Sequence, residues 1–99
     1  QQKSSMRYAD ALSSGDYSVV TRDEQLDDSQ TWIITSVNPE GDEYTIQQKS
    51  SMRYADALSS GDYSVVTRDE QLDDSQTWII TSVNPEGDEY TIQQKSSMR

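Results

Sequence analysis

The sequence predicts an all-β protein, and three observations carry this prediction. One segment of 46 residues occurs twice with identical sequence. Each copy holds four short runs of β-branched and aromatic residues, separated by Gly, Pro, Asn, Asp and Ser. No segment long enough for a helix has apolar residues spaced at the period of about 3.6 residues that an amphipathic helix shows.

The internal repeat sets the domain organisation. Residues 1–46 (the first repeat) are identical to residues 47–92 (the second repeat), and residues 93–99 begin a third copy. We interpret each full repeat as one four-stranded lobe and residues 93–99 as the overlapping start of another strand. Natural repeats drift apart as mutations accumulate, so identity over 46 positions favours an engineered gene over a recent tandem duplication.

Two strands are expected around the junction of the repeats. Residues 42–46 run into Gln47 and Gln48, and Tyr44 and Ile46 lie on one face at a period of two. Residues 53–58, Arg-Tyr-Ala-Asp-Ala-Leu, form the second candidate strand. The period-two face predicts that the first of these strands packs one side against the core.

Turn residues and β-branched residues predict a third strand. Residues 13–16, Ser-Ser-Gly-Asp, combine a glycine that accepts positive φ with side chains that bond their own backbone. Residues 17–21, Tyr-Ser-Val-Val-Thr, follow as the strand. Residues 23–30 are polar apart from Leu26, and they are expected to form a loop.

The fourth strand is the strongest in each repeat. Residues 32–37 read Trp-Ile-Ile-Thr-Ser-Val, and residues 38–42 read Asn-Pro-Glu-Gly-Asp. Pro presets φ at the second position of a type I turn and Gly suits the fourth, so a turn is expected after this strand.

The charge of the chain excludes several classes of partner. Eighteen acidic residues face eight basic ones, and the net charge is −10. Such a chain repels phosphate backbones and anionic membrane surfaces, so neither nucleic acid nor a membrane is an expected partner. No apolar run is long enough for a membrane span and no signal peptide is recognisable, so we expect a soluble chain with cytoplasmic expression.

Missing residue types exclude several kinds of chemistry. The chain has no Cys and no His. Disulfides, thiolate catalysis and Ser–His–Asp catalysis are therefore excluded, and a transition-metal site is not expected. No cofactor-binding motif is present, so we expect neither a cofactor nor an enzyme.

Four strands in 46 residues fit a β-propeller blade or one lobe of a β-trefoil. Each repeat carries a Q-x-W tripeptide, Gln30-Thr31-Trp32 and Gln76-Thr77-Trp78, together with Tyr-Ala-Asp and Tyr-Thr-Ile at matching offsets. In these motifs the whole repeat resembles the ricin-B type β-trefoil lectins, and most closely their fungal branch. The resemblance implies trefoil lobes, with propeller blades as the alternative.

The Q-x-W tripeptide is interpreted as a core anchor. Trp32 and Trp78 are large enough to dominate a core that has few other bulky residues, and equivalent buried environments are expected for both. Gln30 lies two residues before Trp32, so it is expected on the same strand face. Its amide can satisfy loop backbone groups that the fold would otherwise bury without partners.

The resemblance also implies a shallow galactose-type site in each lobe. In that family an Asp accepts bonds from sugar hydroxyls, an aromatic ring stacks on the sugar, and an Asn precedes the Gln of Q-x-W. Here Arg22 stands where the aromatic ring is expected and Ser29 replaces the Asn. The candidate sugar-binding residues are Asp10, Asp56, Arg22, Arg68, Ser29, Ser75, Gln30 and Gln76. Because Arg offers no comparable stacking platform, we expect no measurable binding of galactose or lactose at millimolar concentration.

The sequence offers three other candidate functions. The acidic loop over residues 23–28 has ligands suited to Ca²⁺ but lacks the EF-hand order, and a solvated loop is the preferred interpretation. No two carboxylates are singled out by spacing as a glycosidase pair. Fungal trefoils also include protease inhibitors that act through exposed loops, and this alternative stays open.

The leading functional expectation is structural. It describes an engineered symmetric repeat protein, derived from a ricin-B-like motif, whose open lobes close by oligomerisation. A trefoil needs three lobes and each chain encodes two, so three chains supply the six lobes of two closed trefoils. We therefore expect a homotrimer near three times 11.2 kDa, strengthened by salt. The alternative is a carbohydrate-binding module that takes simple sugars.

Overall fold

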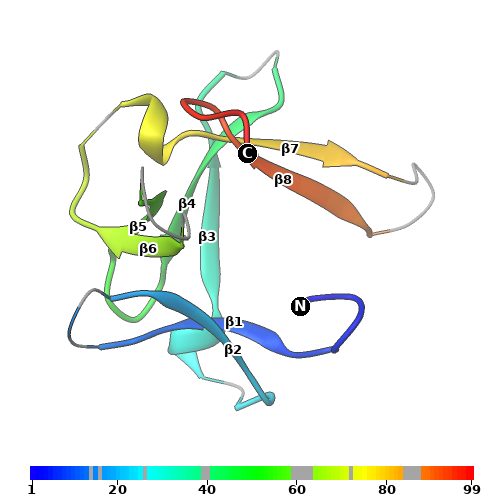
Figure 1. Ribbon diagram of the computed structural model, residues 1–99, viewed down its shortest axis with the longest axis vertical. Helices are drawn as coiled ribbons and strands as arrows, with labels where there is room; N and C mark the ends of the chain where they lie inside the picture. The colour runs from blue at the N-terminus through cyan, green and yellow to red at the C-terminus, as the bar shows by residue number, and fades with distance from the viewer. Residues whose placement is uncertain are drawn as a thin grey trace.

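The described part of the chain consists of short strands. The computed structural model describes residues 1–13, 15, 17–25, 27–38, 41–58, 64–71, 73–83 and 88–99. Within these residues there are eight β-strands, two 3₁₀ turns and no α-helix, so the all-β prediction is confirmed. In chain order (Figure 1) the elements are β1 (Tyr8–Ala11), β2 (Val19–Arg22), η1 (Asp28–Gln30), β3 (Trp32–Ser36), β4 (Glu43–Gln48), β5 (Tyr54–Ala57), β6 (Val65–Arg68), η2 (Asp74–Gln76), β7 (Trp78–Ser82) and β8 (Tyr90–Gln94).

The same four segments therefore form strands each time they occur. The pairs β1 and β5, β2 and β6, β3 and β7, and β4 and β8 have the same sequence over their shared positions. β4 spans positions 46 and 47, where the first repeat passes into the second. None of the described elements is a helix with the length and apolar character that crossing a bilayer requires.

All described strand pairs are antiparallel, and β4 lies at the centre of the larger sheet. β4 pairs with β3, with β5 and with β7, and the sheet ends at β6 on one side and at β8 on the other. β1 and β2 form a separate hairpin. Figure 1 shows this hairpin at the opposite end of β3 from the β7–β8 hairpin.

The predicted turns have the expected geometry where they are described. The N–H of Gly41 donates to the carbonyl of Asn38 at 2.9 Å, the bond that closes a four-residue turn after β3. Gly15 has φ 68, the left-handed region that glycine accepts without steric cost. The other residues of these two turns, Ser14, Asp16, Pro39 and Glu40, lie outside the described residues, as does Leu26 of the predicted loop.

The predicted loop ends in a short turn that the sequence interpretation missed. Asp27 is the N-cap residue of η1, and its carboxylate accepts the N–H of Ser29 at 3.2 Å. An aspartate in this position satisfies a backbone donor that the turn itself cannot pair. Gln30 closes η1, so the expectation that it shares a strand with Trp32 is wrong.

The core is small and contains many polar side chains. Among the described residues, the buried apolar side chains are Ala11, Ala55, Val66 and Trp78, and the buried polar ones are Asp10, Gln48, Asp56, Thr67, Gln76, Thr77 and Gln94. Every described buried polar side-chain atom has a hydrogen-bond partner. Since unpaired polar groups are costly to bury, this pairing is what makes so polar a core tolerable.

Trp32 and Trp78 are not equivalent in burial, contrary to the sequence expectation. Trp78 is 5% exposed, whereas Trp32 is half-buried. The cause is strand position, because β7 lies between β4 and β8 while β3 has β4 as its described partner. Each indole N–H nevertheless makes the same bond, to the carbonyl of Ala9 or Ala55 at 3.0 Å.

Candidate functional site

The candidate site is built around one buried carboxylate in each repeat. Asp10 lies in β1 and is 1% exposed, and Asp56 lies in β5 and is 0% exposed. One oxygen of each carboxylate accepts the next backbone N–H, from Ala11 at 2.7 Å and from Ala57 at 2.7 Å. The strand thus uses half of each carboxylate for its own backbone.

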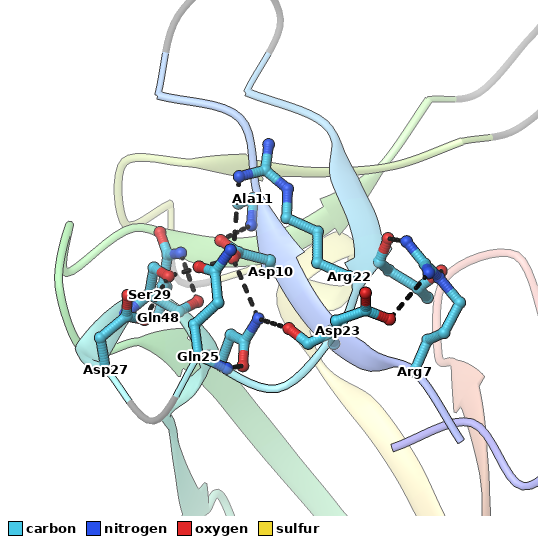
Figure 2. Close-up of polar contacts among 12 residues, drawn as sticks. Arg7, Asp10, Ala11, Arg22, Asp23, Gln25, Asp27, Ser29 and Gln48 are labelled. Atoms are coloured by element: carbon cyan, nitrogen blue, oxygen red, sulfur yellow. Dashed lines mark hydrogen bonds and ion pairs between the residues drawn. The ribbon is translucent and has the colours of Figure 1, made fainter. Parts of the chain in front are cut away.

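The second carboxylate oxygen is held by the end of the 3₁₀ turn. It accepts the hydroxyl of Ser29 at 3.0 Å in the first repeat and that of Ser75 at 3.1 Å in the second. The amide nitrogens of Gln30 and Gln76 lie at 3.5 and 3.4 Å from the same oxygens. Figure 2 shows the first of these clusters, with the carboxylate of Asp10 facing Ser29.

An arginine lies over each carboxylate. Arg22 is 4.0 Å from Asp10, and Arg68 is 3.7 Å from Asp56 (Figure 2 shows the first pair). These arginines occupy the position where the resemblance implies a stacking aromatic ring. The side chains are about 40% exposed, so each guanidinium covers a buried carboxylate with its own charge still facing solvent.

The glutamine of Q-x-W serves the loop, as the sequence interpretation predicted. Gln30 donates to the carbonyl of Asp23 at 2.9 Å and accepts the N–H of Gln25 at 2.9 Å. Gln76 makes the matching bonds to Asp69 and Gln71 at 2.8 and 2.9 Å. A single amide therefore satisfies one donor and one acceptor of the loop backbone in each repeat.

Sequence reasoning missed a second glutamine in each cluster. Gln48 and Gln94 are buried, and their amides donate to the carbonyls of Ser29 at 2.8 Å and Ser75 at 2.9 Å. A signal was available, because the period-two face that carries Tyr44 and Ile46 continues to Gln48. A polar side chain at a core position of a strand predicts an internal hydrogen-bond partner.

A polar cavity of about 390 Å³ opens beside the cluster of the second repeat. Its lining residues are Asp56, Ala57, Leu58, Arg68, Ser75, Gln94, Ser96 and Ser97. The cavity brings together the candidate residues Asp56, Arg68 and Ser75, while Gln76 lies behind them on the same carboxylate. A ligand here would compete with the internal bonds of Asp56 for its oxygens.

A smaller cavity of about 130 Å³ lies near Tyr54 and Glu70. Burial, the negative charge of Glu70 and a hydrogen bond to its carboxylate together raise the pKa of Tyr54 above its usual value. The phenol is therefore stabilised in its neutral form.

The acidic loop is engaged in local contacts. Asp23 pairs with Arg7 at 3.2 Å, Asp28 pairs with Lys49 at 3.6 Å, and Asp27 caps η1. Over the described ranges, no three acidic side chains gather in a position to share a metal ion.

Comparison with known proteins identifies this all-β fold as a β-trefoil. The profile of the ricin-type beta-trefoil lectin domain-like family matches residues 28–99, and the chain belongs to that family. The trefoil prediction is therefore confirmed over the propeller alternative.

One solved structure shows the same fold. It is described as the designed 3-fold symmetric protein ThreeFoil, and it matches with a TM-score of 0.78 at 17% identity. The match covers 91% of this chain and 66% of that one, so the chain spans slightly less than two thirds of its length. Comparison with curated protein sequences found no match.

Proposed function

We propose that this chain is a structural protein whose role is self-assembly: an engineered symmetric trefoil repeat, without catalytic activity, whose lobes are completed by other copies. The observation that carries the proposal is unequal burial of identical residues. Val66 is 1% exposed and Thr67 is 0% exposed, whereas Val20 is half-buried and Thr21 is exposed.

The unequal burial has a visible cause inside the chain. The carbonyl of Tyr17, in the first repeat, accepts the N–H of Thr67 at 2.9 Å and its hydroxyl at 3.1 Å. Arg53 lies over the Tyr17 ring at 4.0 Å from its centre. The first repeat thus covers part of the second, and the matching surface of the first repeat stays open for an equivalent neighbour.

That open surface is already organised to receive a neighbour. Arg7 donates to the carbonyl of Thr21 at 2.8 Å and to its hydroxyl at 3.2 Å. Arg53 makes the same two bonds to Thr67, at 2.6 and 3.2 Å. Because the receiving side chain is held before any contact forms, less conformational entropy is lost on association.

Two ion pairs support an arrangement of lobes about one axis. Lys95 lies 3.0 Å from Glu43, and Lys3 lies 3.2 Å from Glu89. Both pairs join the same two positions of the repeat, and the glutamate is the first residue of β4 in one pair and directly precedes β8 in the other. Recurrence of one contact between different copies is what a symmetric trefoil requires.

Molar mass in solution tests the proposal. Light scattering over a range of concentrations should give a homotrimer near three times 11.2 kDa, with more trimer as salt is added. Salt favours association because each chain carries a net charge of −10. A monomer at every concentration and salt level would refute a self-assembling role.

Carbohydrate binding is the second candidate, and the polar cavity beside Asp56 favours it. Against it, both carboxylates are buried and fully engaged by the backbone, by a serine and by an arginine. Calorimetric titration with galactose and lactose should show no saturable binding at millimolar concentration. A saturable isotherm that Arg68→Ala abolishes, in a variant that keeps its fold, would establish this candidate.

A further inference from the structure

We infer that strand β8 of one copy pairs with strand β3 of a second copy, with Tyr90 opposite Trp32. This inference rests on the proposed function, since it names the interface through which assembly takes place. The two strands begin in different repeats, and each has one edge without a partner among the described strands.

The template for this interface occurs inside the chain. β4 pairs with β7, and the register places Tyr44 opposite Trp78 and Glu43 opposite Ile79. Tyr90 and Glu89 are the repeat equivalents of Tyr44 and Glu43. β3 likewise has the same sequence as β7. A β8–β3 pair between copies would therefore place the same residue types opposite each other as the β4–β7 pair does.

Each aromatic residue of the proposed pair is more exposed than its equivalent in the template. Trp78 is 5% exposed and its partner Tyr44 is half-buried. Trp32 is half-buried and Tyr90 is 56% exposed. Pairing β8 with β3 would cover more of both aromatic side chains, and aromatic anchors of this kind dominate interface energies.

Both strands are already ordered for pairing. One edge of β3 is held by β4, with Trp32 opposite Gln48, and one edge of β8 is held by β7, with Trp78 opposite Gln94. β3 has β4 as its partner among the described strands, and β8 has β7. Ordered edge strands with an exposed apolar face are templates for strand addition.

A second copy is the occupant that the structure favours. The pairing needs a Tyr-containing strand on one side and a Trp-containing strand on the other, and each copy of the chain carries both. The contact joins two different surfaces, so it is head-to-tail and leaves a further open edge on each partner. The exposed residues Ile34 (55%) and Ile92 (56%), on the same two strands, extend the apolar surface that the contact would cover.

Disulfide trapping tests the pairing, because the chain has no cysteine of its own. The template register predicts Glu89 of one copy opposite Ile33 of the other. Directly opposed residues of an antiparallel pair lie about 4.5–5.5 Å apart at Cα, which suits a disulfide. We would mix two single-cysteine variants, Ile33→Cys and Glu89→Cys, under mild oxidation, and quantify mixed dimers by mass spectrometry on denatured samples.

Two controls calibrate the experiment. Ser36→Cys replaces Ile33→Cys as an acceptor that lies on the same strand but out of register. The double variant Glu43→Cys with Ile79→Cys reports the template pair and should close within one chain. We expect the Ile33 and Glu89 variants to give at least about tenfold more mixed dimer than the Ser36 and Glu89 variants.

The outcomes separate this inference from the proposed function. Wild-type chains that associate while Ile33→Cys and Glu89→Cys give no excess of mixed dimer would overturn the β8–β3 pairing and leave self-assembly standing. Wild-type chains that stay monomeric would overturn both. A double variant Ile33→Cys with Glu89→Cys that closes within one monomer would show that β8 folds onto its own β3.

An independent measurement uses Tyr90→Asp. Because Tyr90 is exposed in the single chain, this variant should keep its fold while its apparent dissociation constant rises about tenfold or more. Tyr44→Asp is the matched change at the template position, and it should destabilise the single chain. Unchanged association of folded Tyr90→Asp would overturn the inference.

Discussion

The two repeats have the same letters and the same local hydrogen bonds, yet they differ in burial. The carboxylate of Asp10 accepts the hydroxyl of Ser29 at 3.0 Å, and that of Asp56 accepts the hydroxyl of Ser75 at 3.1 Å. In contrast, Thr21 is exposed while Thr67 is 0% exposed. Identical sequence thus fixes the contacts that lie within a lobe.

Burial is decided by what lies next to the lobe. The second repeat receives the Tyr17 carbonyl of the first repeat at Thr67, whereas Thr21, the matching residue of the first repeat, is exposed. The chain therefore contains its own matched controls. Each substitution can be made at two sites of equal sequence, and the difference between the two effects measures the contribution of the neighbour.

Tryptophan gives the largest expected difference. Trp78→Ala should lower the free energy of unfolding by about 3–5 kcal/mol, because it empties a buried site. Trp32→Ala should cost about half as much at low protein concentration, since its side chain is half-buried. Urea denaturation measures both. Equal losses in the monomer would contradict the asymmetry, while convergence at high concentration would indicate that association covers Trp32.

Substitution of the buried carboxylates should lower the free energy of unfolding equally in the two repeats, unlike substitution of the tryptophans. Asp10 and Asp56 are 1% and 0% exposed, and each binds within its own lobe. Alanine at either position removes the ion pair of the arginine, the bond to the next backbone N–H and one of the two carboxylates that the serine hydroxyl contacts. The change should cost about 2–3 kcal/mol. Denaturation of Asp10→Ala and Asp56→Ala in parallel checks this. A large difference between the two would show that the neighbouring repeat also stabilises this cluster.

Threonine isolates the contact between the repeats. Thr67→Ala removes the hydroxyl that donates to Tyr17 and accepts from Arg53, and should cost about 1–2 kcal/mol. Thr21→Ala, at the exposed site, should stay within about 0.5 kcal/mol. Thermal unfolding at low concentration measures both changes. An equal effect of the two changes would argue against the Tyr17 contact as the source of the asymmetry.

Alkaline pH gives the smallest effect. The folded state raises the pKa of Tyr54 above 10.0 through burial and the Glu70 carboxylate, so the folded state keeps its proton longer than the unfolded state. That contribution to stability is complete below pH 10 or so and is lost as pH rises through the folded pKa. Tyr54→Phe should therefore flatten the decline of unfolding free energy above that pH. Tyr8→Phe, at the matching site, supplies the background, and identical curves for the two variants would refute this assignment.

Local features of the fold were predictable from the sequence, because each depends on a few neighbouring residues. The strand at Trp32 and the turn closed by Asn38 and Gly41 follow from β-branched residues and from turn chemistry that a few neighbouring letters specify. The loop function of Gln30 followed from the need to satisfy backbone groups. The capped turn η1 was missed because three residues give no periodicity to detect.

The sequence predicted which residues form the candidate site, but it did not predict the hydrogen bonds and ion pairs that they make with each other. Asp10, Ser29 and Arg22 do come together, but sequence alone could not show that they bind each other. The role of Gln48 depends on a loop 19 positions away. The inequality of Trp32 and Trp78 was out of reach for a further reason, since no rule applied to identical letters can give different answers for the two.

The central strand has a consequence for how such a chain is read as modules. β4 runs from Glu43 to Gln48 across the point where one copy of the text gives way to the next, and strands on both sides pair with it. A repeat counted from residue 1 therefore does not coincide with the unit that the backbone hydrogen bonds of β4 hold together. Cleavage of the chain between residues 46 and 47 would sever β4, the strand that both repeats share. A cut in the loop between β3 and β4 would instead release β4 to β8 as one uninterrupted hydrogen-bonded piece.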